Sequence, residues 1–262
     1  YTESPGQQVI NELLQKALSA ALAEIPAGRG VRVLEIGAGT GGTTAFLLPH
    51  LDPNRTEYVF TDVSRLFTNK AGERFAEHAF VRCEVLDIER DPLEQGFPAH
   101  GFDIVIAANV LHATRTMRET LRHVRSLLAP GGALLLAEGT LRQRWIDLIF
   151  GLTEGWWRFA DRDLRPHHAL LASAAWESLL KENGFAEVVA LPSDTAREQL
   201  AFPQVLLAAQ ADGTVQATDA EKRWLVLGDA RGAGIALAAE LRNGGDHCIL
   251  AQAGGRFCSD GE

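Results

Sequence analysis

In the stretch LEIGAGTGG, residues 34–42, four glycines directly follow a run of apolar residues. The overlapping run VRVLEIG, residues 31–37, has the length and the Val, Leu and Ile content of a buried strand. Glycines at 37, 39 and 42 match the spacing of a nucleotide-binding turn that joins a strand to a helix. A tight turn without a ligand would use the same glycines, because glycine tolerates a positive φ. In either case the stretch predicts the start of an open α/β sheet.

Apolar runs of strand length recur along the chain, and helical patterns separate them. The runs show little polar alternation, which is typical of parallel strands covered by helices on both faces. Strands are expected at residues 31–37, 56–62, 79–87, 102–108 and 132–139, and helices at residues 4–25, 42–51, 64–77 and 116–128. The alternation predicts a parallel sheet with right-handed crossovers. The sequence APGG behind the last of these helices predicts a sharp stop and a turn.

The pattern changes after residue 140. The segment 141–166 carries three of the five tryptophans and is expected to form a helix, a loop and a second short helix. A further helix is expected at residues 173–183, followed by a closing antiparallel pair of strands at residues 185–192 and 202–210. We expect three parts in all: a core at residues 1–210, a polar linker at 211–222 and a partial second fold at 223–262.

Composition excludes several classes of partner. The 262 residues are 46% hydrophobic, and the net charge of −9 argues against nucleic acid or an anionic membrane surface as a partner. Cys83, Cys248 and Cys258 are widely spaced, form no metal-ligand cluster and fit a reducing, cytoplasmic setting. No signal peptide and no run long enough to cross a bilayer is visible. Since no Met begins the chain, both ends are expected to be cuts in a longer polypeptide.

Two acidic residues near the glycines narrow the choice of ligand. Asp62 ends the second expected strand, about 20 residues after the last glycine, where a carboxylate can bind ribose hydroxyls. No Lys with Ser or Thr follows the glycines, which excludes a triphosphate-binding loop. A dinucleotide would place its pyrophosphate at the helix N-terminus. S-adenosylmethionine has no phosphate, and its cationic sulfur favours the acidic setting that Glu35 provides.

Five motifs in order resemble those of the class I S-adenosylmethionine-dependent methyltransferases: VLEIGAGTGGTT, YVFTDVS, VLDIERDP, FDIVIAANVLHAT and LLAPGGALLLAEGT. The segment LRQRWIDLIFGLTEGWWRF resembles more closely the methyltransferase domains of modular polyketide synthases. The resemblance covers residues 1–210. It implies a Rossmann-like α/β fold, a mostly parallel sheet with an antiparallel last strand and helices on both sides. It also implies S-adenosylmethionine as cofactor and S-adenosylhomocysteine as product.

The resemblance implies a role for each residue at the carboxyl ends of the strands. Gly37, Gly39 and Gly41 would pass under the methionine portion, which Glu35 would orient. Asp62 would hold the ribose. The remaining contacts would come from Asp87 to the adenine amine, from Leu86 and Ile88 to the adenine ring, and from Asn109 to the methionyl end. For Asp87, an ordinary helix cap is the alternative interpretation.

His112 and Glu138 follow the fourth and fifth strands on the same rim. Neighbouring strands lie about 5 Å apart, so contact between the two side chains is expected. A carboxylate on one ring nitrogen fixes the tautomer and increases the basicity of the other nitrogen. The resemblance implies that this pair is a catalytic His–Glu dyad. The alternative is a solvated loop histidine near an unrelated glutamate.

The acceptor atom is less well defined by the sequence. Aromatic side chains are expected to line the substrate pocket, namely Trp145, Trp156, Trp157, Phe159 and Tyr1. Packing in the core would explain each of these aromatic residues equally well. Carbon methyltransferase domains of this family usually carry a lid domain ahead of the core, and only about 30 residues precede the first strand here. We therefore expect transfer to the β-hydroxyl oxygen of an acyl chain on an acyl carrier protein. The alternatives are the α-carbon of a β-ketoacyl chain and a non-catalytic structural domain.

The tail WLVLGDARGAGIALAAEL, residues 224–241, has glycines at 228, 232 and 234 and resembles the nucleotide loop of a ketoreductase. The catalytic Tyr and Lys of a ketoreductase are absent. The tail therefore predicts a truncated structural fragment without NADPH activity. The expected partners are the carrier protein and neighbouring synthase domains, with no metal, nucleic acid or membrane.

Overall fold

The computed structural model describes residues 5–193, 204–213, 223–228, 232–245 and 247–252. The chain divides into two compact units, residues 1–214 and 215–262. The predicted boundary at residue 210 falls inside the last strand of the first unit, and most of the predicted linker lies outside the described residues. Within the described ranges, the structure has no helix long and apolar enough to cross a bilayer.

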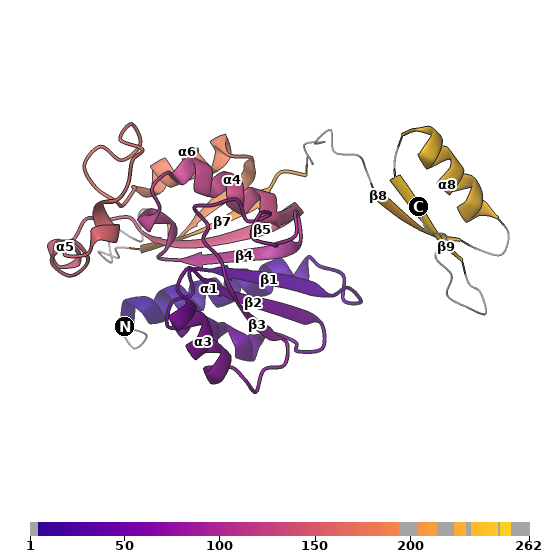
Figure 1. The fold of residues 1–262 in the computed structure, drawn as a ribbon. Helices are drawn as coiled ribbons and strands as arrows, with labels where there is room; N and C mark the ends of the chain where they lie inside the picture. Colours follow the sequence, from indigo (N-terminus) through magenta and orange to yellow (C-terminus); the bar gives the residue numbers. More distant parts are fainter. Residues whose placement is uncertain (1–4, 194–203, 214–222, 229–231, 246, 253–262) are drawn as a thin grey trace. The chain divides into compact units, whose positions relative to one another are not determined.

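The first unit is a seven-stranded sheet in the order β3-β2-β1-β4-β5-β7-β6 (Figure 1). Its strands are β1 (Val31–Ile36), β2 (Thr56–Asp62), β3 (Val81–Val85), β4 (Phe102–Ala108), β5 (Leu128–Gly139), β6 (Phe185–Leu191) and β7 (Gln204–Ala211). The first five strands are parallel, and β7 runs antiparallel to both β5 and β6. The predicted parallel sheet with an antiparallel closing pair is therefore confirmed.

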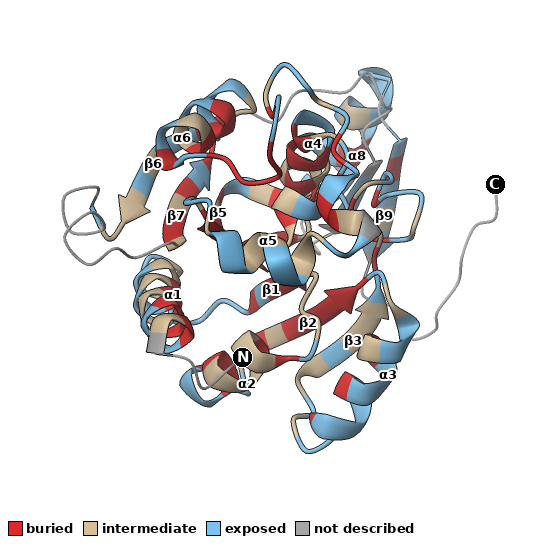
Figure 2. Ribbon diagram, turned by 90° about the vertical axis from the view of Figure 1, so that its left-hand side faces the viewer, coloured by how far each residue is buried: buried red, intermediate tan, exposed pale blue. Residues whose placement is uncertain are grey.

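Helices cover both faces of this sheet (Figure 1). They are α1 (Pro5–Ala23), α2 (Gly42–Leu47), α3 (Arg65–Arg74), α4 (Met117–Leu127), α5 (Arg144–Phe150) and α6 (Ser173–Glu182), with short 3₁₀ turns η1 (Leu48–His50), η2 (Leu111–Ala113) and η3 (Glu154–Trp157). One apolar core packs α4 and α6 on the sheet, and a second packs α1, α2 and α3 on the other face. Along β1, Leu34 and Ile36 enter the first core and Val33 enters the second. Figure 2 shows the buried residues concentrated along the strands.

One predicted turn is wrong. Residues 129–132, the APGG sequence, belong to β5, which begins at Leu128 directly behind α4. Phe102 of β4 pairs with Leu128 of β5, and the next pair is Ile104 with Ala133. More residues of β5 than of β4 therefore lie between these two pairs, which makes the register irregular at this point. Gly131 takes a positive φ of 73° within this stretch. The predicted helix stop is present, because α4 ends at Leu127, but the glycines lie in an irregular part of β5 where a separate turn was expected.

The second unit consists of β8 (Arg223–Gly228), α8 (Ala233–Asn243) and β9 (His247–Gln252). The two strands pair in parallel, and Val226, Ala238 and Cys248 form a small core beneath the helix. The strand and the helix expected in this tail are present, while residues 229–231 between them lie outside the described residues, and β9 adds a second strand. One β-α-β unit results.

Candidate active site

A cavity of about 960 Å³ opens at the carboxyl ends of β1, β4 and β5. This is the rim where open α/β sheets bind ligands. The first strand contributes its glycine loop, the fourth strand contributes Asn109 and His112, and α1, α5 and β7 close the sides. Its described lining residues include Gly6, Gln7, Gly37, Gly39, Thr40, Asn109, His112, Gly139, Trp145, Ile146, Phe150, Trp156, Leu170 and Gln204.

The glycine loop needs glycine for two different reasons. Gly37, Gly39 and Gly41 all take positive φ values, of 61°, 56° and 73°. A Cβ at Gly37 would lie 2.2 Å from Val110 Cγ2, and one at Gly41 would lie 2.9 Å from Phe75. A Cβ at Gly39 would meet nothing within 4 Å. Gly37 and Gly41 thus permit close packing, whereas Gly39 leaves open space at the cavity wall.

Glu35 does not reach this cavity. Its side chain is 1% exposed, and its Oε2 accepts hydrogen bonds from Thr44 Oγ1 at 2.5 Å and Tyr58 OH at 2.6 Å. Burial raises the pKa of Glu35, and the pKa of Tyr58 is raised well above its ordinary value by burial and by the neighbouring Glu35. The expectation that Glu35 directly orients a methionine portion differs from this geometry. Glu35 instead ties α2 to β1 and β2 beneath the loop.

Asp62 also supports the glycine loop. Its Oδ2 accepts the Gly39 N–H at 3.0 Å, and its Oδ1 accepts the Ser64 N–H at 2.8 Å. The carboxylate therefore anchors Gly39 at the cavity wall, although Asp62 itself is not among the described lining residues. Each carboxylate oxygen has a second lone pair, so these bonds leave Asp62 able to accept a hydroxyl.

The residues expected around an adenine ring are packed differently from one another. Leu86 and Ile88 are 2% and 6% exposed and belong to the core on the α4 side of the sheet. Asp87 lies between them, and its Oδ1 accepts the Glu89 N–H at 3.0 Å. None of the three is among the described residues that line the cavity. Residues 88–90 form a turn and not a helix, so Asp87 caps a turn, and the helix cap given as the alternative is not present.

Asn109 has a partner that the sequence did not suggest. It takes a positive φ of 54°, and its Oδ1 accepts a hydrogen bond from Gln204 Nε2 at 3.1 Å. Gln204 is the first residue of β7 and also lines the cavity. The two amides thus form one polar patch in the wall. No signal in the sequence points to Gln204, because 95 residues separate it from Asn109.

The structure brings His112 and Glu138 into contact. His112 Nδ1 lies 2.6 Å from Glu138 Oε2, and the side chains are 11% and 0% exposed. Glu138 is acceptor-only when ionised, so Nδ1 then carries the proton and Nε2 keeps a free lone pair. The contact predicted between these residues is therefore present. Its arrangement is that of a histidine base held by a carboxylate.

The turn that carries His112 is shaped by the same glutamate. Glu138 Oε1 accepts the N–H groups of Val110 at 3.2 Å and His112 at 3.3 Å. The ring of Trp156 stands edge-on to the His112 ring, with centroids 5.4 Å apart. Glu138 thus fixes both the backbone and the ring, and Trp156 packs against the ring.

The expected aromatic pocket forms only in part. Trp145 and Trp156 line the cavity. Trp157 is 45% exposed, and Phe159 is buried beneath Arg162 and Arg165, so neither is among the described lining residues. Tyr1 lies outside the described residues. Sequence reasoning missed the apolar wall that α5 and its neighbours supply, namely Ile146, Phe150 and Leu170.

Comparison with known proteins adds the family context. A family model described as a methyltransferase domain matches residues 34–134. The reducing polyketide synthase BOA6 of Botryotinia fuckeliana is 38% identical over 217 residues, which make up 82% of this chain and 9% of that protein. The chain thus spans less than a tenth of the length of this curated relative.

Two solved structures are similar over most of the chain. The CurJ carbon methyltransferase is 51% identical with a TM-score of 0.78, covering 80% of this chain and 56% of that one. The trans-methyltransferase CalH, in complex with SAH, is 36% identical with a TM-score of 0.64, covering 77% of this chain and 55% of that one. At these identities the similarity extends to the sequence as well as to the fold.

Proposed function

We propose that this protein methylates the α-carbon of a β-ketoacyl chain held on an acyl carrier protein. The chain contains a methyltransferase domain of the kind that polyketide synthases carry, and its methyl donor is S-adenosylmethionine. The observation that carries the proposal is the His112–Glu138 pair, of which His112 lines the same cavity as the glycine loop. A base beside a methyl-donor site is the arrangement that alkylation of a weak carbon acid requires.

The residues present fit the methyl donor. Gly39 leaves open space at the cavity wall, and the loop carries no cationic side chain that would repel a sulfonium. Gly37, Gly39 and Asn109 would hold the methionyl end of the cofactor. Asp62, which already binds the Gly39 N–H, would accept hydrogen bonds from the hydroxyl groups of the cofactor's ribose. S-adenosylmethionine, when bound, supplies a methyl group that its positively charged sulfur activates for displacement.

The chain's own contribution is to position the acceptor and to take its proton. His112 Nε2 would remove the α-proton of the β-ketoacyl group, and the electron pair of that C–H bond would remain on the substrate as an enolate nucleophile. Glu138 would stabilise the imidazolium that forms, through its bond to Nδ1. The apolar wall of Trp145, Ile146 and Phe150 would hold the acyl chain and exclude water.

The earlier preference for the β-hydroxyl oxygen is not supported. It rested on the short stretch ahead of the first strand, but the CurJ carbon methyltransferase also matches over only 56% of its own length. A short matching segment is therefore compatible with a carbon acceptor. A carbon between two carbonyls is also acidic enough for a histidine to deprotonate before attack, whereas a hydroxyl is not.

The carrier protein and neighbouring synthase domains are the partners that this proposal needs. BOA6 is a polyketide synthase, and in such a polypeptide the acceptor would arrive as a thioester. The second unit, β8-α8-β9, would be a structural ketoreductase-like fragment, for which we propose no NADPH activity.

The acceptor atom can be tested directly. The protein is incubated with S-adenosylmethionine and either a β-ketoacyl or a β-hydroxyacyl carrier protein, and the products are weighed by mass spectrometry. A mass gain of one methylene on the ketoacyl substrate alone is expected. A gain on the hydroxyacyl substrate alone would restore the oxygen acceptor, and cofactor binding without transfer to either would indicate a structural domain.

A further inference from the structure

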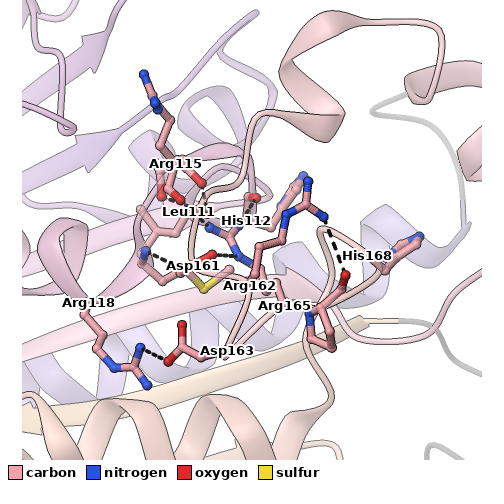
Figure 3. Close-up of polar contacts among 12 residues, drawn as sticks. Leu111, His112, Arg115, Arg118, Asp161, Arg162, Asp163, Arg165 and His168 are labelled. Atoms are coloured by element: carbon pink, nitrogen blue, oxygen red, sulfur yellow. Dashed lines mark hydrogen bonds and ion pairs between the residues drawn. The ribbon is translucent and has the colours of Figure 1, made fainter.

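Two buried charged side chains hold the turn that carries His112, one from each side. Glu138 takes the N–H groups on the amino-terminal side, as described above. On the carboxyl-terminal side one guanidinium binds three carbonyls (Figure 3). Arg165 Nη1 donates to His112 O at 2.8 Å, and Nη2 donates to Thr114 O at 2.8 Å and Arg115 O at 3.1 Å. The backbone of the histidine itself is therefore one of the anchoring points.

Asp161 fixes the orientation of that guanidinium. Its Oδ1 accepts a hydrogen bond from Arg165 Nε at 2.6 Å, and its Oδ2 accepts the Met117 N–H at 2.8 Å. The Arg165 side chain is 0% exposed, and the ring of Phe159 lies 5.2 Å from its central carbon. Because all three guanidinium nitrogens, Nε, Nη1 and Nη2, donate hydrogen bonds, the guanidinium is held in one orientation.

A buried ion pair is an expensive way to hold a loop. The desolvation of two charges commonly offsets their attraction, and apolar side chains of similar volume often stabilise a fold equally well. A planar guanidinium offers something that apolar packing lacks, a rigid fork of donors that sets the position of several carbonyls at once. The Arg165–Asp161 pair thus indicates a requirement for geometry at the turn.

We propose that Arg165, oriented by Asp161, is a positioning residue that sets where His112 Nε2 points in the cavity. The inference rests on the proposed role of His112 as the base. Glu138 restrains the Nδ1 side of the ring, and Arg165 removes the remaining freedom of the turn to shift along the rim. A displacement of about 1 Å at a reacting group can lower a rate about 100-fold.

The same region contains a matched control. Arg118 on α4 pairs with Asp163 at 2.7 Å, so this bridge also joins the start of α4 to the loop that carries Asp161 (Figure 3). Its side chains are 47% and 67% exposed, and Arg118 bonds Asp163 instead of the backbone of the His112 turn. The variant R118M should therefore leave the rate within about twofold of the wild type, since exposed ion pairs contribute little.

The test uses R165M, R165K and R118M, each in the wild-type and the H112A background. Thermal unfolding checks the fold, calorimetry measures affinity for S-adenosylmethionine, and single-turnover methylation of a β-ketoacyl thioester measures the rate. R165M should lower the rate at saturating substrate about 10- to 100-fold, with cofactor affinity and KM within about threefold. In the H112A background it should cause no further loss, because residues that act through one group are not additive.

Several outcomes would overturn the inference. They are an unchanged rate in folded R165M, an equal fold-loss in both backgrounds, or a loss that R118M reproduces. If R165M does not fold, R165K decides, because lysine keeps the charge but not the fork and should still slow the reaction.

A second measurement needs no activity. Nitrogen-15 NMR of the His112 ring should show an Nδ1–H tautomer in the wild type and an altered ring signal in R165K. A wild type that binds S-adenosylmethionine but transfers nothing would overturn the proposed function. The ring signals alone would then decide on Arg165, and an unchanged signal in R165K would refute its positioning role.

Discussion

Two buried glutamates lie near the ends of parallel strands of one sheet, but their hydrogen-bond partners differ. Glu35 in β1 is 1% exposed, and Glu138 in β5 is 0% exposed. Glu35 accepts hydrogen bonds from two hydroxyl groups that do not line the cavity, whereas Glu138 bonds two backbone N–H groups and the ring of His112, which does line the cavity. Burial of a carboxylate at a strand end is therefore no guide to its role. The partner decides, because only a titratable base in the cavity wall can pass on a proton.

Removal of the base should have the largest effect. H112A is expected to lower the single-turnover methylation rate about 1,000-fold, within the range that general acid–base catalysis supplies. Its affinity for S-adenosylmethionine should stay within about twofold of the wild type, measured by calorimetry, because the glycine loop is untouched. A parallel loss of cofactor affinity would instead place His112 in the cofactor site.

Matched substitutions of the two glutamates test the comparison itself. E138Q should lower the methylation rate about 100-fold, because an amide cannot stabilise the imidazolium and can present its NH₂ to Nδ1. E35Q should change the rate less than about threefold, since Gln keeps an acceptor for Thr44 and Tyr58. Rates at saturating cofactor check both variants. Equal losses would mean that Glu35 takes part in the chemistry after all.

Two glycine substitutions separate the loop from the dyad. G37A places a Cβ 2.2 Å from Val110 Cγ2 and should displace the His112 turn, lowering the rate about 10-fold. G39A places its Cβ in open space and should weaken cofactor binding about 10-fold. Both alanines bear the cost of a positive φ, about 1–2 kcal/mol, so each serves as the control for the other. Calorimetry and rate measurements that fail to separate the two would contradict this assignment.

The smallest effect concerns the dependence of stability on pH. Burial raises the folded-state pKa of Glu35, so above the ordinary glutamate pKa the folded protein keeps a proton that the unfolded chain loses. The contribution of Glu35 to stability therefore falls as pH rises through that window, by up to about 1.4 kcal/mol per pH unit. E35Q should remove this slope, as urea unfolding at about pH 5 and about pH 7 would show. An unchanged slope in E35Q would assign it to another group.

The fold was largely predictable because its signals are local. Apolar runs, glycine spacing and helix patterns indicated every strand of the first unit and the antiparallel pairing of β6 with β7. The APGG sequence misled because glycine and proline suit a bulge as well as a turn, and only pairing with β4 distinguishes the two. The expected contact between His112 and Glu138 followed from strand-end positions, which a parallel sheet brings to one rim.

The chain's own residues specify the sheet, the glycine loop and the pair at the rim, because hydrophobic period and positive φ act over a few neighbouring positions. Contacts between distant segments depend on how the helices and loops pack, which no local pattern records. Gln204 reaches Asn109 across 95 residues, and Arg165 reaches the carbonyl of His112 across 53. The surroundings of Glu35, bonded to Thr44 and Tyr58 and not to the cavity, were also decided by packing, since these donors reach it only in the folded molecule.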